Sequence, residues 1–105
     1  MKNNSKYKIE FIDKKAVKEY KRLDGSVKKL VDIALSKLSY RADEIGKPLE
    51  RELLGCKEIK FRKDGIRIIF RIVNGQVEIV EIISIGSRED VVFKEALKRL
   101  EKTLK

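Results

Sequence analysis

The fold is decided by the stretch KEIKFRKDGIRIIFRIVNGQVEIVEIISI, residues 57–85, which holds nine isoleucines, eight of them between Ile66 and Ile85. Isoleucine and valine favour strands because a branched Cβ packs well on a pleated surface. Two dipeptides, Asp64-Gly65 and Asn74-Gly75, divide the stretch, and both are typical of two-residue hairpin loops because their residues tolerate positive φ. The stretch therefore predicts a three-stranded antiparallel meander. Its strands are expected near 58–63, 66–73 and 76–84.

Helical periodicity precedes the meander. After a short strand expected at 7–12, Asp13 stands where an N-cap belongs, and Asp24-Gly25 ends the first helix. Ser26 is expected to cap a second helix, because apolar residues recur from Val27 at i, i+3, i+4, i+7 and i+8. The short connection predicts that the two helices form an antiparallel hairpin.

Two further segments complete the predicted fold. Gly46-Lys47-Pro48 opens a loop before the meander, and after Gly86 the helical period returns. The chain is therefore expected to be α+β: a compact single domain with an N-terminal strand and a helical hairpin packed on an antiparallel β-meander, followed by a C-terminal helix. The domain spans 1–105, with residues 1–6 as a flexible N-terminus.

Length and composition exclude several classes of protein. The chain has 105 residues, 42% hydrophobic and 41% charged, which fits one domain with a modest core. No apolar run approaches the roughly 18–20 residues of a transmembrane helix, and no signal-peptide core follows the N-terminus. One cysteine, Cys56, and no histidine exclude an internal disulfide, a structural zinc site and the hydrolases that need a histidine base. A reducing, cytoplasmic location is expected.

The balance of charge gives a positive indication. Lys and Arg number 26 against 17 Asp and Glu, a formal charge of +9. Such a domain is expected to bind nucleic acid or an acidic protein, and the alternative is a basic surface that serves solubility alone. Glu58-Ile59-Lys60, with Asp43 or Glu44 upstream, matches half of a metal-dependent nuclease motif, but this triplet also occurs by chance in any chain rich in Lys and Glu.

The first predicted loop sets the register of the meander. If Asp64-Gly65 is a two-residue loop, the face that carries Ile59 turns to the core. Glu58 then lies opposite Arg71 on the other face, and a two-residue second loop adds Glu78 as a neighbour. Arg71 is therefore expected to have two acidic neighbours and a structural role.

The same register places Arg62 opposite Arg67, with Lys60 near them. Like charges directly opposite each other destabilise a sheet by about 1 kcal/mol or less, so an unneutralised cluster indicates an anion site for phosphate. The alternative is a solvated basic face whose side chains splay apart. Arg88 follows the last strand, a position commonly given to function, and is either a site residue or a surface arginine.

Three segments together resemble a known family. They are Leu53-Leu54-Gly55, the hairpin from Glu58 to Phe70, and Ile82-Ile83-Ser84-Ile85-Gly86-Ser87-Arg88-Glu89. In order and spacing they resemble the RelE branch of the RelE/ParE toxin superfamily, over nearly the whole chain. The resemblance implies a toxin of a toxin–antitoxin module, a small endoribonuclease that enters the ribosomal A site and cuts the mRNA codon there.

The resemblance also implies the chemistry and the partners. The ribose 2′-OH attacks the adjacent phosphate, with no metal and no other cofactor. The implied partners are mRNA, the ribosomal A site and an acidic antitoxin, with no membrane. The helical hairpin 13–40 and the sheet edge are the expected docking surfaces for the antitoxin.

Residue by residue, Lys60, Arg67 and Arg88 match the family's catalytic basic positions. Lys60 would handle the proton, Arg67 would hold the scissile phosphate, and Arg88 would stabilise the transition-state charge or the leaving side. Further RNA contacts are expected from Lys57, Arg62, Lys63 and Phe93.

Two positions depart from the family pattern. Glu58 stands where well-studied members carry a second lysine, and Lys57 beside it is the candidate to compensate. Phe93 lies near their functional tyrosine; it can stack on a base, but it cannot transfer a proton, and its apolar stripe also makes it a core candidate. The alternatives are a ParE-like inhibitor of DNA gyrase, which would generally lack the catalytic basic set, and a non-catalytic homologue that binds RNA or a partner.

Overall fold

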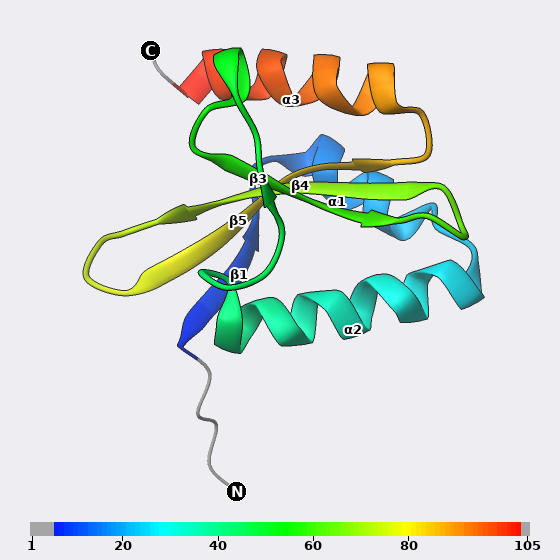
Figure 1. Cartoon of the computed structure of the whole chain (residues 1–105), viewed down its shortest axis with the longest axis horizontal. Helices are drawn as coiled ribbons and strands as arrows, with labels where there is room; N and C mark the ends of the chain where they lie inside the picture. The colour runs from blue at the N-terminus through cyan, green and yellow to red at the C-terminus, as the bar shows by residue number, and fades with distance from the viewer. Residues whose placement is uncertain (1–5, 104–105) are drawn as a thin grey trace, which may run out of the picture.

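The strands and helices follow the predicted order along the chain (Figure 1). The computed structural model describes residues 6–103. Residues 1–5, which make up most of the segment 1–6 predicted as a flexible N-terminus, and residues 104–105 lie outside that range. The α+β prediction is confirmed. The elements are β1 (Tyr7–Phe11), α1 (Lys14–Lys21), α2 (Gly25–Arg41), β2 (Lys47–Pro48), the 3-10 turn η1 (Arg51–Leu53), β3 (Cys56–Phe61), β4 (Ile66–Val73), β5 (Glu78–Gly86) and α3 (Glu89–Thr103).

The strands form one five-stranded sheet in the order β1-β5-β4-β3-β2. The predicted meander of β3, β4 and β5 is confirmed, and β1 lies parallel to β5 at one edge. The loop predicted at Gly46-Lys47-Pro48 is wrong in part, because Lys47 and Pro48 pair with Glu58 and Lys57 as the other edge strand. Proline is tolerated there because an edge strand can leave the side without an N–H facing outwards.

Both hairpin loops hold four residues, 62–65 and 74–77, where two-residue loops were predicted. Gly65 is the last residue of the first loop, with φ 68°, and its N–H donates to the Phe61 carbonyl oxygen at 2.8 Å. Glycine therefore closes a wider turn than the one predicted. Lys60 lies opposite Arg67 as a result, two positions from the expected pairing. Because side chains alternate with a period of two, this shift leaves every side chain of β3 and β4 on its predicted face.

A bulge interrupts the pairing of β4 with β5. Ile69 lies opposite Ser84, whereas Phe70 lies opposite Ile82, so Ile83 is the extra residue of β5. Ile83 and Ser84 then both point to the face that α3 covers: Ile83 joins the core there, and the Ser84 hydroxyl donates to the Val92 carbonyl oxygen at 2.9 Å. The bulge thus gives α3 two consecutive buried contacts on one strand.

Helix α2 packs on one face of the sheet and α3 on the other, below and above the sheet in Figure 1. The predicted core face is confirmed, since its six residues all belong to the cluster under α2. These residues are Ile59, Phe61, Ile66, Ile68, Phe70 and Ile72. The second face, predicted to be a basic surface, is partly a second core, because α3 packs there on Ile69, Ile83 and Cys56.

The helix starts agree with the prediction at one of two places. Asp13 caps α1, accepting a hydrogen bond from the Ala16 N–H at 2.9 Å, as predicted. The Ser26 cap is wrong: α2 begins at Gly25, and the Asp24 carbonyl oxygen accepts the bond from the Lys28 N–H at 2.7 Å. Residues 22–24 join the two helices. No helix within residues 6–103 is long and apolar enough to cross a membrane.

A buried arginine fastens α3 to the rest of the molecule. Arg99 is 4% exposed and donates to both carboxylate oxygens of Glu19 in α1, each at 2.8 Å, and to the Ile83 carbonyl oxygen at 2.9 Å. Hydrogen bonding to Glu19 raises the pKa of the Arg99 guanidinium above its ordinary value. Glu19 also accepts from the Ile85 N–H at 3.1 Å. This arginine clamp joins α1, β5 and α3.

Candidate functional site

The three predicted catalytic residues come together at one end of the sheet. Lys60 of β3 lies directly opposite Arg67 of β4, and such pairs place their Cβ atoms about 4.5–5.5 Å apart. Arg67 in turn lies opposite Gly86 of β5, and Arg88 follows two residues later. Figure 1 shows this end on the right, where the β3–β4 loop and the link from β5 to α3 lie.

Arg67 is not the unneutralised charge that the sequence predicted. Its Nη1 donates to Glu58 Oε2 at 3.0 Å, and its Nη2 lies 3.3 Å from Glu89 Oε1. The predicted pairings of Arg62 with Arg67 and of Glu58 with Arg71 are therefore wrong. The longer loop is the cause, because it moves Glu58 two positions along β4, next to Arg67.

Arg71 has the structural role that was predicted, with a different partner. Its Nε donates to Glu81 Oε1 at 2.7 Å. Glu81 lies opposite Arg71 because the second loop is longer than predicted, so that the ladder starts with Val73 opposite Ile79. Glu78, the neighbour expected from a two-residue loop, pairs with Tyr7 of β1 instead.

Lys60 and Arg88 are the more accessible cations of the site. Lys60 is exposed, and among the described residues no carboxylate lies within ion-pair distance of its amine. Arg88 is exposed as well, and its nearest carboxylate, Asp90, is 4.0 Å from its Nε. Both side chains are therefore free to contact an anion from solvent.

The predicted RNA contacts separate into two groups. Arg62 and Lys63 lie exposed in the β3–β4 loop, at the same end as Lys60. Lys57 lies on the opposite face, where its amine donates to the Ala42 carbonyl oxygen at 3.0 Å. Lys57 and Arg67 therefore lie on opposite faces of the sheet, and this placement does not support Lys57 as the residue that compensates for Glu58. Phe93 is half-buried and packs on the core under α3.

One site residue was missed. Glu89 begins α3 and contacts Arg67. The sequence feature that could have indicated it is an acidic residue in the first turn of a helix, where the helix dipole favours negative charge. The proposed metal motif gains no support, since Glu44 and Asp43 pair with Arg41 and Lys6. Within residues 6–103 no group of Asp, Glu, Cys or His side chains could hold a metal ion.

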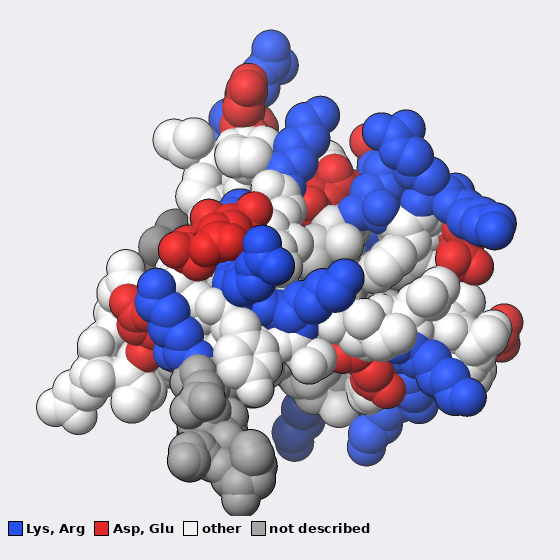
Figure 2. Space-filling model, turned by 60° about the horizontal axis from the view of Figure 1, so that its bottom comes forward, with Lys and Arg blue, Asp and Glu red and all other residues white. Residues whose placement is uncertain are grey.

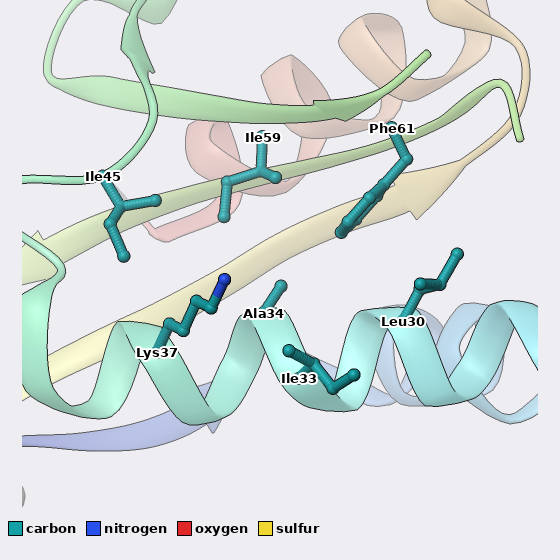
Figure 3. Close-up of a pocket in the computed structure, with 7 residues that line it drawn as sticks. All are labelled: Leu30, Ile33, Ala34, Lys37, Ile45, Ile59 and Phe61. Atoms are coloured by element: carbon teal, nitrogen blue, oxygen red, sulfur yellow. The ribbon is translucent and has the colours of Figure 1, made fainter. Parts of the chain in front are cut away.

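A second feature is an apolar groove between α2 and β3, shown in Figure 3. Its volume is about 270 Å³, and Lys37 is its one charged lining residue. Because β2 pairs only with residues 57–58 of β3, residues 59–61 have no strand on their outer side within the described chain. The groove is lined by Leu30, Ile33, Ala34, Lys37, Ile45, Ile59 and Phe61.

On the face that carries α2, many basic side chains surround areas of uncharged surface. Figure 2, which brings the bottom of Figure 1 forward, shows Lys and Arg side chains along this face, with uncharged surface and smaller groups of Asp and Glu between them. They gather most densely at the right, the end where Figure 1 places the β3–β4 loop. A partner that covers this face must therefore tolerate or match positive charge.

Comparison with known proteins identifies relatives. No model of a protein family matches the chain. The mRNA interferase toxin RelE of Escherichia coli K12 is 33% identical over 100 residues, covering 90% of this chain and 97% of its own. A mutant of E. coli toxin RelE in the free state superposes with a TM-score of 0.73 at 29% identity, over 90% of this chain and 97% of that one.

A further similar structure contains a bound partner. It is a mutant of E. coli toxin RelE in complex with a peptide of the antitoxin RelB, with a TM-score of 0.69 at 28% identity. The match covers 87% of this chain and 94% of that one. The likeness therefore extends over the sheet and the helices on both of its faces.

Proposed function

The chain belongs to the RelE toxin family, and from this premise we propose that it is the toxin of a toxin–antitoxin module and cuts mRNA in the ribosomal A site. The observation that carries the proposal is the convergence of Lys60, Arg67 and Arg88 at one end of the sheet. The relative named mRNA interferase toxin RelE, similar over 97% of its length, supports the same activity.

The proposed reaction is an internal transesterification. The ribose 2′-OH loses its proton and attacks the adjacent phosphorus, and the bond from phosphorus to the 5′-oxygen of the next nucleotide breaks. A cyclic 2′,3′-phosphate results, and the departing 5′-oxygen takes up a proton from solvent to give a 5′-OH. The phosphorane-like transition state carries one more negative charge than the ground state, so oriented cations accelerate the step.

Each cation has a proposed role. Lys60 takes part in proton transfer at the 2′-OH, Arg67 holds a non-bridging phosphate oxygen, and the exposed Arg88 supports the departing 5′-oxygen. The reaction needs no metal in this proposal, because the side chains supply the positive charge. Arg62 and Lys63 contact the flanking phosphates, and Phe93 offers a ring for stacking at the margin of the site.

We also propose an acidic antitoxin as the protein partner, with an amphipathic segment that fills the groove between α2 and β3. The groove is apolar apart from Lys37, and residues 59–61 of β3 leave their outer side free of a strand. The chain's charge of +9 favours a partner of opposite charge. The antitoxin peptide bound to the E. coli relative supports an antitoxin as the partner.

A non-catalytic RNA-binding role has one observation in its favour. Arg67, the central residue of the proposed site, is compensated by two carboxylates. In this alternative the protein binds RNA through Lys60, Arg88 and the loop cations but leaves the RNA intact.

An mRNA cleavage assay on programmed ribosomes separates the two. The 5′ ends are mapped by primer extension for the wild type, for Arg67→Ala and for the matched control Arg71→Ala. Arg71 lies on the same strand and face, paired with Glu81. We expect ribosome-dependent cuts within the A-site codon, lost in Arg67→Ala and kept in Arg71→Ala. RNA binding without any cut by the wild type would establish the non-catalytic role instead.

A further inference from the structure

The two carboxylates that hold Arg67 differ in their surroundings. The Glu58 side chain is 9% exposed and lies on β3, opposite the fully buried Ile69. The Glu89 side chain is 60% exposed and begins α3. Arg67 itself is 14% exposed, and its Nη1 contacts the buried carboxylate whereas its Nη2 contacts the exposed one.

The burial of the two carboxylates determines which of their contacts with Arg67 is harder to break. An ion pair out of water is costly to break, because the remaining charge is left buried and uncompensated. An ion pair with an exposed partner is weak and can be replaced by another anion. The bond from Nη1 to Glu58 is therefore the anchor, and the contact of Nη2 with Glu89 is the replaceable one.

A phosphate is a suitable replacement for the Glu89 carboxylate. Guanidinium binds carboxylate and phosphate oxygens through the same N–H groups and at similar distances. When Glu89 leaves Nη2, its exposed side chain moves into water and no core contact is lost. Lys60, directly opposite Arg67, and Arg88, beside Glu89 in sequence, remain to contact the incoming anion.

We propose that Glu58 is a positioning residue that fixes the Arg67 guanidinium through Nη1, and that Glu89 holds the phosphate position at Nη2 in the free protein and yields it to RNA. The inference rests on the proposed function, since it assigns the anion as an RNA phosphate. It gives opposite roles to two acidic residues that touch the same side chain. Glu58 supports phosphate binding, and Glu89 competes with it.

The matched variants are Glu58→Gln and Glu89→Gln, which each remove one negative charge beside Arg67 and keep the side-chain shape. The probes are inorganic phosphate and a 2′-O-methyl RNA trinucleotide, which cannot be cleaved because the attacking hydroxyl is blocked. Binding to the free protein is followed by NMR through the Arg67 side-chain signals. Glu81→Gln, in the separate pair with Arg71, is the control.

We expect Glu89→Gln to bind both probes about two- to five-fold more tightly, the range that an exposed ion pair supports. Glu58→Gln is expected to bind them more weakly and to broaden the Arg67 guanidinium signals, because the anchor is lost. Glu81→Gln should match the wild type. If charge alone mattered, both site variants would tighten binding equally, and that result would overturn the proposal.

Two further readings complete the test. In ribosome assays Glu89→Gln should lower KM, whereas Glu58→Gln should raise KM and also lower kcat about ten-fold or more, because the anchor that orients Arg67 is lost. If Glu58→Gln does not fold, the absence of tighter binding in Glu89→Gln still overturns the proposal. Probe binding needs neither ribosome nor cleavage. If the wild type cuts no mRNA but Glu89→Gln binds the probes more tightly and Glu58→Gln more weakly, the nuclease function is contradicted and this inference stands.

Discussion

Replacing Arg99 tests how firmly α3 is held over the sheet. Arg99→Met keeps a long apolar stem and removes the guanidinium, which makes four hydrogen bonds. Two go to Glu19 at 2.8 Å, one goes to the Ile83 carbonyl oxygen at 2.9 Å, and a longer one goes to Glu95 at 3.3 Å. The substitution leaves Glu19 partly buried beside an apolar side chain.

The expected loss is large for a domain of this size. Breaking a buried ion pair by removing one partner costs about 3–5 kcal/mol, and small domains have only about 5–15 kcal/mol of total stability. The lower part of the range is expected, because Glu19 retains the Ile85 N–H and is about a quarter exposed. We therefore expect a loss of about 3 kcal/mol.

Urea denaturation followed by circular dichroism measures the effect. With a slope of about 1–3 kcal/mol per molar urea, a loss of about 3 kcal/mol lowers the midpoint by about 1–3 M. The double variant Glu19→Leu with Arg99→Met replaces both members of the main ion pair by apolar groups. It should recover at least half of the loss, because the Glu19 carboxylate is no longer left without its guanidinium.

Two results would refute this reasoning. A loss below about 1 kcal/mol in Arg99→Met would mean that the clamp contributes no more than a surface ion pair. A double variant as unstable as the single one would mean that packing around the arginine stem, rather than the uncompensated carboxylate, sets the loss.

Three other changes have defined outcomes. Ile59→Asp places a charge in the groove between α2 and β3 and should weaken antitoxin binding at least ten-fold, measured by titration calorimetry with the coexpressed antitoxin. Tyr40 is exposed and lies outside the groove lining, so Tyr40→Asp should leave the affinity unchanged. Gly86→Ala brings a Cβ to 2.8 Å from Val92 and should lower the free energy of unfolding by about 1–3 kcal/mol in urea. Burial raises the pKa of the Cys56 thiol, so at pH 8 its alkylation by iodoacetamide should be slower than that of free cysteine and should accelerate in urea; equal rates would contradict the burial.

The faces of β3 and β4 could be predicted because side-chain alternation tolerates an error of two residues. The loop at Asp64-Gly65 was predicted too short by two, yet Ile59 and Ile68 still face the core. The cross-strand partners do not share that tolerance, so the sequence paired Glu58 with Arg71 instead of Arg67. A register known only to within two positions identifies a face but not an ion pair.

The contacts of α3 with the rest of the molecule could not be predicted from local sequence patterns. The sequence predicts the helix, but nothing in its periodicity states that Arg99 reaches Glu19, 80 positions away. The bulge in β5 is similarly hidden, because Ile82 and Ile83 are both isoleucine and alternation cannot show which of them faces α3. These features depend on long-range packing, and they decide how much of the predicted basic face remains open.

The parallel pairing of β1 with β5 has a consequence for synthesis. Tyr7 and its partner Glu78 are 71 positions apart. At a translation rate of about 5–20 residues per second, Glu78 is therefore synthesised about 4–14 s after Tyr7. Until then β1 and α2 have no completed sheet to pack on. The candidate site uses β3, β4 and β5 together, and it forms only when translation has passed Arg88. A growing chain therefore cannot bind RNA through this site while most of it is still being synthesised.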